Sequence, residues 1–222
     1  MLRTFFAIVT IVGMAHSVVA DEPAKGVEPG QVLPGPFNAY IVFGGPKPKP
    51  PVNEPTQTVE RVNHGDPSRA GKFHDLVTRY GLNPTVAIIA REAPPAEDQP
   101  LAQLIKWLDQ SVQKNRNERL HAFAIFLRLN NDFLKDDTRI PQINQIKDFA
   151  TKLDLKETPL AIDLAESDRT KAFRIGGEDA ITVLVFDDHL KVRNRFVFTA
   201  DKPLDEAGIK SIQDAVSKLI KK

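Results

Sequence analysis

The chain contains no cysteine, and this absence excludes more types of reaction than any residue that is present. Without a thiol there is no disulfide, no thiolate nucleophile and no cysteine ligand for a metal. Thiol–disulfide exchange and cysteine-based peroxide reduction are therefore excluded. Stability must come from the core, and 222 residues suffice, because a domain of about 200 residues buries roughly 70% of the surface of its unfolded chain.

The chain also lacks a large excess of positive or negative charge. The chain has 30 Lys and Arg against 29 Asp and Glu, so nothing concentrates cations for phosphate contacts and we expect no nucleic-acid partner. The histidines after the first 20 residues show no metal-ligand spacing; they are His64, His74, His121 and His189. We therefore predict no metal site and no cofactor.

One hydrophobic run opens the chain. Arg3 precedes an apolar stretch over residues 5–15, and the small residues Val18 and Ala20 precede an acidic segment. This pattern is typical of a secretory signal peptide cleaved after Ala20, which predicts an exported, periplasmic or extracellular protein without a transmembrane segment in its mature chain. The alternative is a retained N-terminal anchor, although the run is shorter than the roughly 20 residues that span a bilayer.

Proline and glycine mark the following stretch. We interpret residues 21–56 as a Pro/Gly-rich N-terminal arm with one short strand at residues 37–43, and residues 57–222 as the folded domain. The sequence GGPKPKPPVNEP at residues 44–55 favours polyproline backbone and predicts a stiff spacer. The alternative is a PxxP ligand for a partner domain.

From residue 71 the hydrophobic pattern becomes regular. Apolar runs predict strands at residues 85–90, 121–129, 159–162 and 181–186, with an edge strand at 191–198 after a turn at 187–190. Helical spacing predicts helices at residues 73–80, 101–112, 143–153, 168–173 and 209–220. Pro141 is expected in the first turn of its helix, where proline is tolerated. This order predicts an α/β fold with a mixed sheet and helices on both faces.

The order of elements resembles the thioredoxin-like fold, a three-layer α/β/α architecture with a mixed central sheet. Within that superfamily the chain is most similar to peroxiredoxins and to the exported thioredoxins that mature cytochromes. The opening GQVLPGPFNAYIVFGG at residues 30–45 is similar to theirs, and ETPLAIDLAESDRTKAFRIG at residues 157–176 resembles the peroxiredoxin segment before the last hairpin. The resemblance covers residues 30–220.

The redox loop of that family matches VAIIAREAPPAE at residues 86–97. In this match Ala93 and Ala96 stand at the two cysteine positions, and Pro94 and Pro95 stand between them. A helix N-terminus in the family lowers the pKa of a thiolate, but alanine offers no ionisable atom. The resemblance therefore implies a redox-inactive member of the fold.

A second family motif is also altered. The family places a cis-proline before a threonine and a hydrophobic strand, whereas this chain has Ala180, Ile181 and Thr182, with Ile181 at the proline position. A cis bond before isoleucine costs about 2.5–4 kcal/mol, so we expect a trans peptide there.

Three other residues, Glu97, Asp98 and Trp107, have two interpretations each. Glu97 and Asp98 are expected to cap the following helix, the alternative being acid–base chemistry. Trp107 falls at the side of the apolar stripe of its helix. It either seals the helix against a neighbouring loop or anchors a partner.

The sequence leaves three hypotheses for function. The first is a non-enzymatic module that binds a protein or peptide in a groove beside residues 93–96 and 180–182. The second is an enzyme with non-thiol chemistry that uses Asp98, His74 or Arg91. The third is an envelope-associated structural protein whose proline-rich arm makes the contact. The fold alone does not choose among them.

Overall fold

The computed structural model describes residues 27–44, 69–129 and 136–221. The predicted signal peptide at residues 1–20 and almost all of the proline-rich spacer lie outside the described residues. Within the described ranges, no helix combines the length and the apolar character that crossing a bilayer requires.

A seven-stranded mixed sheet forms the centre of the molecule. Its strands are β1 (Asn38–Phe43), β2 (Phe73–Asp75), β3 (Thr85–Ala90), β4 (His121–Leu129), β5 (Leu160–Leu164), β6 (Ile181–Phe186) and β7 (Val192–Phe198). They follow the order β2-β1-β5-β4-β3-β6-β7. The pairs β3–β4 and β4–β5 are parallel and the other pairs are antiparallel, which confirms the predicted mixed sheet.

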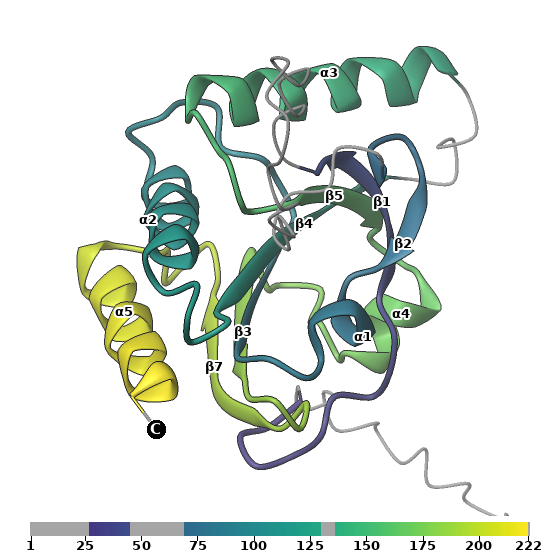
Figure 1. Ribbon diagram of the computed structural model, residues 1–222. Helices are drawn as coiled ribbons and strands as arrows, with labels where there is room; N and C mark the ends of the chain where they lie inside the picture. The colour runs from purple at the N-terminus through teal and green to yellow at the C-terminus, as the bar shows by residue number, and fades with distance from the viewer. Residues whose placement is uncertain (1–26, 45–68, 130–135, 222) are drawn as a thin grey trace, which may run out of the picture.

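Helices cover both faces of this sheet (Figure 1). They are α1 (Val77–Tyr80), α2 (Pro100–Lys114), α3 (Asp136–Lys152), α4 (Asp168–Ala172) and α5 (Glu206–Ile220). Apolar residues of α2, α3 and α5 pack into one core, and those of α1 and of the turn that ends α4 pack into the other. The predicted three-layer α/β/α arrangement is therefore confirmed.

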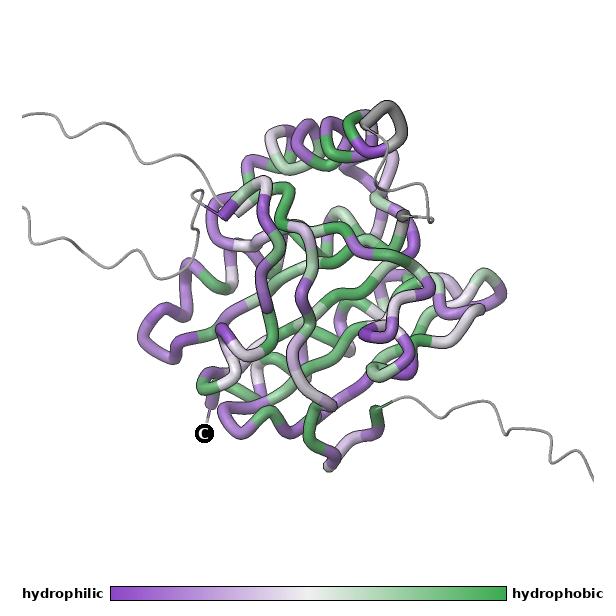
Figure 2. Tube along the Cα trace, turned by 90° about the vertical axis from the view of Figure 1, so that its right-hand side faces the viewer, coloured by the Kyte–Doolittle hydropathy of each residue, from purple (hydrophilic) through white to green (hydrophobic). Residues whose placement is uncertain are grey.

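The central strands are buried on both faces. Along β3, Ile88 and Ala90 face the core under α2, α3 and α5, whereas Ala87 and Ile89 face the other core, as the alternation of side chains along a strand requires. Figure 2 shows this as hydrophobic colour along the strands in the middle of the molecule. Strands covered on both faces have continuous apolar runs, which is why the ends of β3, β4 and β6 were predicted to the residue.

Two local predictions were wrong. Residues 73–80 do not form one helix, because residues 73–75 pair with β1 as the edge strand β2 and only Val77–Tyr80 is helical. Pro141 does not lie in a first turn, because α3 begins at Asp136 and carries the proline inside the helix. That proline removes one backbone N–H donor from the helix.

Asp109 fixes α2, the helix that follows the candidate loop. Its carboxylate is 2% exposed and accepts hydrogen bonds from the backbone N–H groups of Lys156, Glu157 and Thr158, at 3.0, 2.7 and 2.8 Å. Buried carboxylates are stable when backbone donors satisfy them in this way. The contact holds α2 to the segment that enters β5.

Candidate functional site

The loop between β3 and α2 carries residues 93–96, the four that the sequence resemblance matches to a redox loop. Ala93 and Pro94 are buried, Ala93 with 5% of its surface exposed, whereas Pro95 and Ala96 are exposed to solvent. Two consecutive prolines restrict the loop backbone and supply no N–H donors. The loop therefore presents a stiff, apolar tip at the junction of sheet and helix.

The expected caps of α2 are not formed by acids. The N-cap is Gln99, which makes no side-chain capping hydrogen bond, and Pro100 begins the helix. Glu97 and Asp98 precede the cap, and the first turn contains no acidic residue. The prediction was wrong because proline at N1 shifts the helix start beyond both acids; Asp98 instead accepts a hydrogen bond at its carbonyl oxygen from the Gln103 amide, at 2.9 Å.

Arg91 ties the start of this loop to the segment before β6. Its backbone N–H donates to the carbonyl oxygen of Ala180 at 3.0 Å. Its guanidinium donates from Nε to the carbonyl oxygen of Asp179 at 3.0 Å and from Nη2 to that of Gly176 at 2.7 Å. A rigid guanidinium can hold two acceptors at once, so Arg91 acts as a clamp between residues 91 and 176–180.

Asp179 supports the same segment from within. Its Oδ2 accepts hydrogen bonds from the Gly176 N–H at 3.0 Å, the Thr182 hydroxyl at 3.1 Å and the Arg195 guanidinium at 3.3 Å. The side chains of Asp179 and Arg195 are 13% and 16% exposed, so water screens this ion pair only weakly. No spacing in the sequence identified Asp179 as the centre of this network.

The segment at the lost cis-proline position is a regular part of β6. Ile181 pairs with Ala90 and Thr182 pairs with Ile89, in an antiparallel ladder. No cis peptide bond occurs among the described residues, in agreement with the trans peptide expected before Ile181. The hydrogen bonds of Arg91 and Asp179 tie this side of the loop to the start of β6.

A groove opens on the other side of the loop, toward α3. Its volume is about 450 Å³, and its lining consists of Pro94, Pro95, Ala96, Glu97, Asp98, Gln145, Asp148, Phe149 and Lys152. Helix α3 packs over β1 and β5, whereas β6 lies beyond β3 in the sheet. Pro94, Pro95 and Ala96 are therefore brought to this groove, while Ala180, Ile181 and Thr182 do not line it.

Trp107 lies away from this groove. Its ring is partly buried against the core under α2 and borders a second hollow of about 350 Å³ between α2 and α5, lined also by Lys114, Val216 and Ile220. The ring thus packs against the core and keeps one edge in solvent.

The three residues considered for non-thiol chemistry are not brought together. His74 lies on β2, at the edge of the sheet, and β1, β5 and β4 separate it from β3 and the loop that holds Arg91 and Asp98. The Arg91 guanidinium is engaged with carbonyl oxygens. General acid–base chemistry needs its groups within hydrogen-bond reach of one substrate atom, and this set does not meet that condition.

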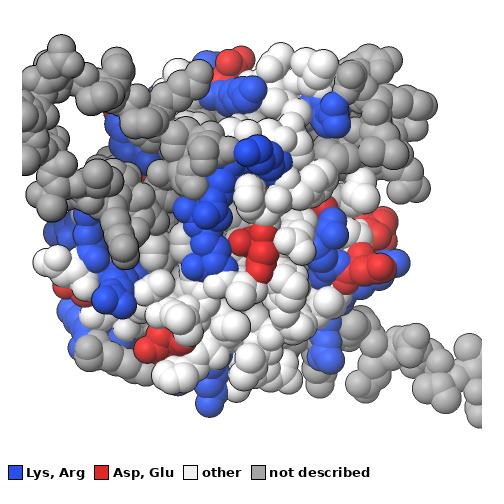
Figure 3. All heavy atoms as spheres, turned by 45° about the vertical axis from the view of Figure 1, so that its right-hand side comes forward, with Lys and Arg blue, Asp and Glu red and all other residues white. Residues whose placement is uncertain are grey.

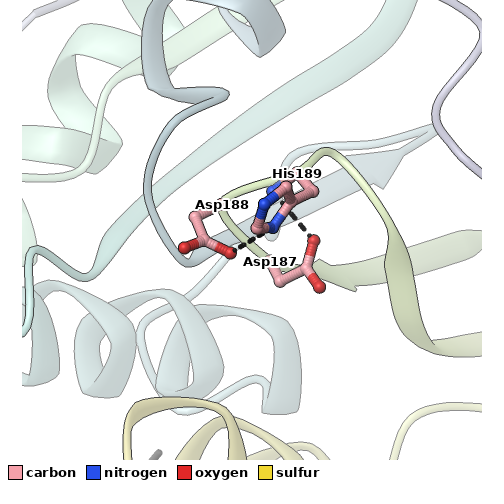
Figure 4. Close-up of side chains that lie close together, drawn as sticks. All are labelled: Asp187, Asp188 and His189. Atoms are coloured by element: carbon pink, nitrogen blue, oxygen red, sulfur yellow. Dashed lines mark hydrogen bonds and ion pairs between the residues drawn. The ribbon is translucent and has the colours of Figure 1, made fainter.

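A further group, at the turn between β6 and β7, was not singled out by the sequence. Within the described ranges, Asp187, Asp188 and His189 form one group of three metal-ligand types whose atoms lie within 4.8 Å of one another (Figure 4). They border a hollow of about 660 Å³. Spacing rules for metal motifs overlook residues that are consecutive in a turn.

The carboxylate of Asp187 already forms hydrogen bonds within that turn. Its Oδ1 accepts from the N–H groups of His189 and Lys191, both at 3.0 Å, and its Oδ2 accepts from Arg193 Nε at 2.7 Å. Burial alone raises the pKa of this carboxyl, but these donors outweigh burial and lower the pKa below its ordinary value. The carboxylate stabilises the predicted turn at residues 187–190, and we assign it no metal.

Comparisons with known proteins establish the fold and nothing finer. No protein-family model matches the chain, and no curated protein matches it in sequence. Among solved structures, a thiol:disulfide interchange protein DsbE from Chlorobium tepidum is 11% identical, with a TM-score of 0.53 over 87% of this chain and 99% of that one.

Two further structures are similar to the same extent. AhpC from Mycobacterium tuberculosis is 8% identical, with a TM-score of 0.53 over 87% of this chain and 99% of its own. An uncharacterized conserved protein from Geobacillus kaustophilus is 15% identical, with a TM-score of 0.54 over 87% of this chain and 82% of its own. The chain therefore has a thioredoxin-like fold, and it has this fold without any cysteine.

Proposed function

We propose that this chain is an exported, redox-inactive thioredoxin-like protein that binds a protein or peptide partner and catalyses no reaction. The binding site is the groove between the loop at residues 93–98 and α3. One observation carries the proposal: the apolar tip formed by Pro95 and Ala96 is exposed at the mouth of a groove of about 450 Å³.

The dimensions and the stiffness of the site support binding. Ligand pockets typically enclose about 300–1,000 Å³, and the volume of this groove, about 450 Å³, lies within that range. Because proline restricts the loop, little conformational entropy is lost when a partner docks against it. A clamped loop beside an open groove is a pre-organised surface.

The lost cysteines support a role without electron transfer. In redox members of the fold, the amides and dipole at the helix N-terminus stabilise a thiolate. Here the corresponding residues, Ala93 and Ala96, hold methyl groups, and α2 begins with Pro100, which has no amide N–H to offer. What remains for such a loop is to present its surface to a binding partner.

Export is the second part of the proposal. Residues 1–20 carry the pattern of a secretory signal, and a chain without cysteine is insensitive to the redox state of the compartment that it enters. A partner would then be another exported protein or a peptide in the same compartment.

Affinity capture with matched variants tests the groove. Ala96→Trp fills the mouth of the groove with a large ring, whereas Ala172→Trp places the same ring at an exposed position at the end of α4. We expect the first variant to lose most of the partner that the unmodified protein captures from the exported protein fraction, and the second to retain it. Equal capture by both variants, with equal thermal stability, contradicts the proposed site.

A further inference from the structure

The charges around the groove are unbalanced. Three carboxylates, of Glu97, Asp98 and Asp148, line it together with a single ammonium group, that of Lys152, which gives the groove a local charge of −2. The whole chain carries a formal net charge of +1, so the excess of carboxylates is local to the groove and is not a property of the whole chain. Figure 3 shows a different side, that of β2 and α4 in Figure 1, where Lys and Arg are more prominent than Asp and Glu.

These four charged side chains are exposed to solvent. Among the described residues, none of them forms an ion pair or a side-chain hydrogen bond with another group of the protein. Elsewhere the acids that shape the fold, such as Asp109 and Asp187, have every carboxylate oxygen in a hydrogen bond. The groove carboxylates are therefore available to a ligand without the loss of an internal contact.

Apolar groups lie between the acids. Pro94 and Phe149 are buried beneath the groove, Phe149 with 5% exposed, and Pro95 and Ala96 form its exposed wall. A segment that fills this space must therefore place an apolar side chain in the middle and positive groups at the rim. Phosphate-bearing ligands such as nucleic acid or anionic lipid are repelled by the same carboxylates.

We propose that the groove recognises a short extended segment of a partner protein that carries an apolar residue between lysines or arginines. This inference rests on the proposed function and names the chemistry of its partner. The apolar residue packs on Pro94, Pro95 and Phe149, and the cations lie against Glu97, Asp98 and Asp148. Rim charges of this kind act mainly on the association rate and on selectivity.

A peptide titration tests the inference. The probe is a fluorescein-labelled nonapeptide, Gly-Ser-Lys-Leu-Pro-Leu-Lys-Ser-Gly, followed by fluorescence anisotropy with the purified full chain. We expect saturable binding that weakens at least tenfold when both lysines of the peptide are replaced by glutamate. We expect binding to weaken also between 0.05 and 1 M salt, because the Debye length falls to about 3 Å at 1 M.

Matched triple variants locate the charge effect. Glu97→Gln with Asp98→Asn and Asp148→Asn should weaken binding about tenfold, because the triple variant removes all three rim carboxylates that attract the lysines of the peptide. The control combines Glu118→Gln, Glu166→Gln and Asp201→Asn, which removes the same charge from exposed acids elsewhere and should leave affinity unchanged. Equal weakening in both triples would overturn the inference, because the attraction would then be non-specific.

The outcomes separate the inference from the function on which it rests. If the lysine and glutamate forms of the peptide bind equally and Ala96→Trp abolishes binding, the groove binds peptides but the charge preference is wrong. If Ala96→Trp leaves binding intact, the proposed site itself fails. If the unmodified protein binds none of the peptides, or forms a dimer that the groove triple dissolves, the cationic segment is the wrong occupant.

Discussion

At the scale of single residues, Arg91 makes the two sides of the altered loop different, because it forms its hydrogen bonds on one side only of that loop. Its guanidinium bridges the carbonyl oxygens of Gly176 and Asp179, and Asp179 in turn holds Thr182 and Arg195. This guanidinium ties the loop to the segment before β6. The groove lies on the other side of the loop, toward α3.

Removal of this clamp should cost stability and loosen one segment. Arg91→Ala leaves two carbonyl oxygens without their donor, and we expect the free energy of unfolding to fall by about 2 kcal/mol, together with faster amide hydrogen exchange at residues 176–182. Arg91→Lys should recover only part of the loss, because an ammonium group cannot hold both acceptors in one plane. Urea denaturation and exchange mass spectrometry measure both effects.

A control defines what would contradict this assignment. Lys106→Ala removes an exposed cation from α2, outside the clamp, and should change stability by less than about 0.5 kcal/mol. If Arg91→Ala behaves like Lys106→Ala and exchange at residues 176–182 is unchanged, Arg91 does not hold the loop.

At the scale of elements, the β6–β7 turn shows how one carboxylate stabilises a hairpin. Asp187 accepts from His189, Lys191 and Arg193, whereas the neighbouring Asp188 is 58% exposed and, within the part of the chain that the structure describes, pairs with the exposed His189 ring alone. The two adjacent acids therefore differ in their contribution to folding. The pKa of Asp187 lies below its ordinary value because the hydrogen-bond donors around it outweigh its burial.

The pH dependence of stability should reveal that difference. Because the pKa of Asp187 in the folded state lies below its ordinary value of 3.8, the ionised carboxylate stabilises the fold above about pH 4, and this stabilisation is lost as the pH falls through the folded-state pKa. Asp187→Asn should lower the free energy of unfolding by about 1–3 kcal/mol at pH 7. The gap between the variant and the unmodified protein should narrow toward pH 3.

Asp188→Asn is the matched control for the turn. It removes an exposed acid one residue away and should leave the unfolding free energy nearly unchanged at every pH. A constant gap between Asp187→Asn and the unmodified protein from pH 7 to pH 3 would show that the carboxylate charge is not what stabilises the hairpin.

The elements that could be predicted from the sequence are those whose pattern is local. The largely apolar runs of β3, β4 and β6 give their ends directly, because burial on both faces leaves few polar positions inside them, such as Thr182 in β6. Strand β2 has only three residues, and its conformation depends on pairing with β1, more than 30 positions earlier in the chain. A pattern read along the chain favours a helix there, and the pairing overrides it.

The candidate site was predictable to the same limited degree. The loop at Ala93 and Ala96 could be located because a strand and a helical stripe flank it. The contribution of Asp148 and Phe149 to the groove could not be predicted, because the packing of α3 against this loop is set by the whole sheet. The same holds for Asp179, whose partners Arg91 and Arg195 lie on two other segments.

At the scale of the whole molecule, the three-layer fold persists without the sulfur chemistry found in some of its structural neighbours. The match to DsbE from Chlorobium tepidum covers 87% of this chain and 99% of that one at 11% identity, which shows how little of the sequence the architecture constrains. The two apolar cores and the mixed sheet account for the fold, and cysteine contributes nothing to either. The loop at the junction of β3 and α2 is thereby free to serve as a binding surface.

The most direct test of that claim is photo-crosslinking in the native compartment. A benzophenone amino acid replaces Ala96 in one strain and Ala172 in another, and irradiated cells are examined for covalent adducts of the protein. A discrete adduct with one partner from position 96, and none from position 172, is the predicted result. Adducts of equal yield from both positions, or none from position 96 while a partner still co-purifies, would contradict binding at the groove.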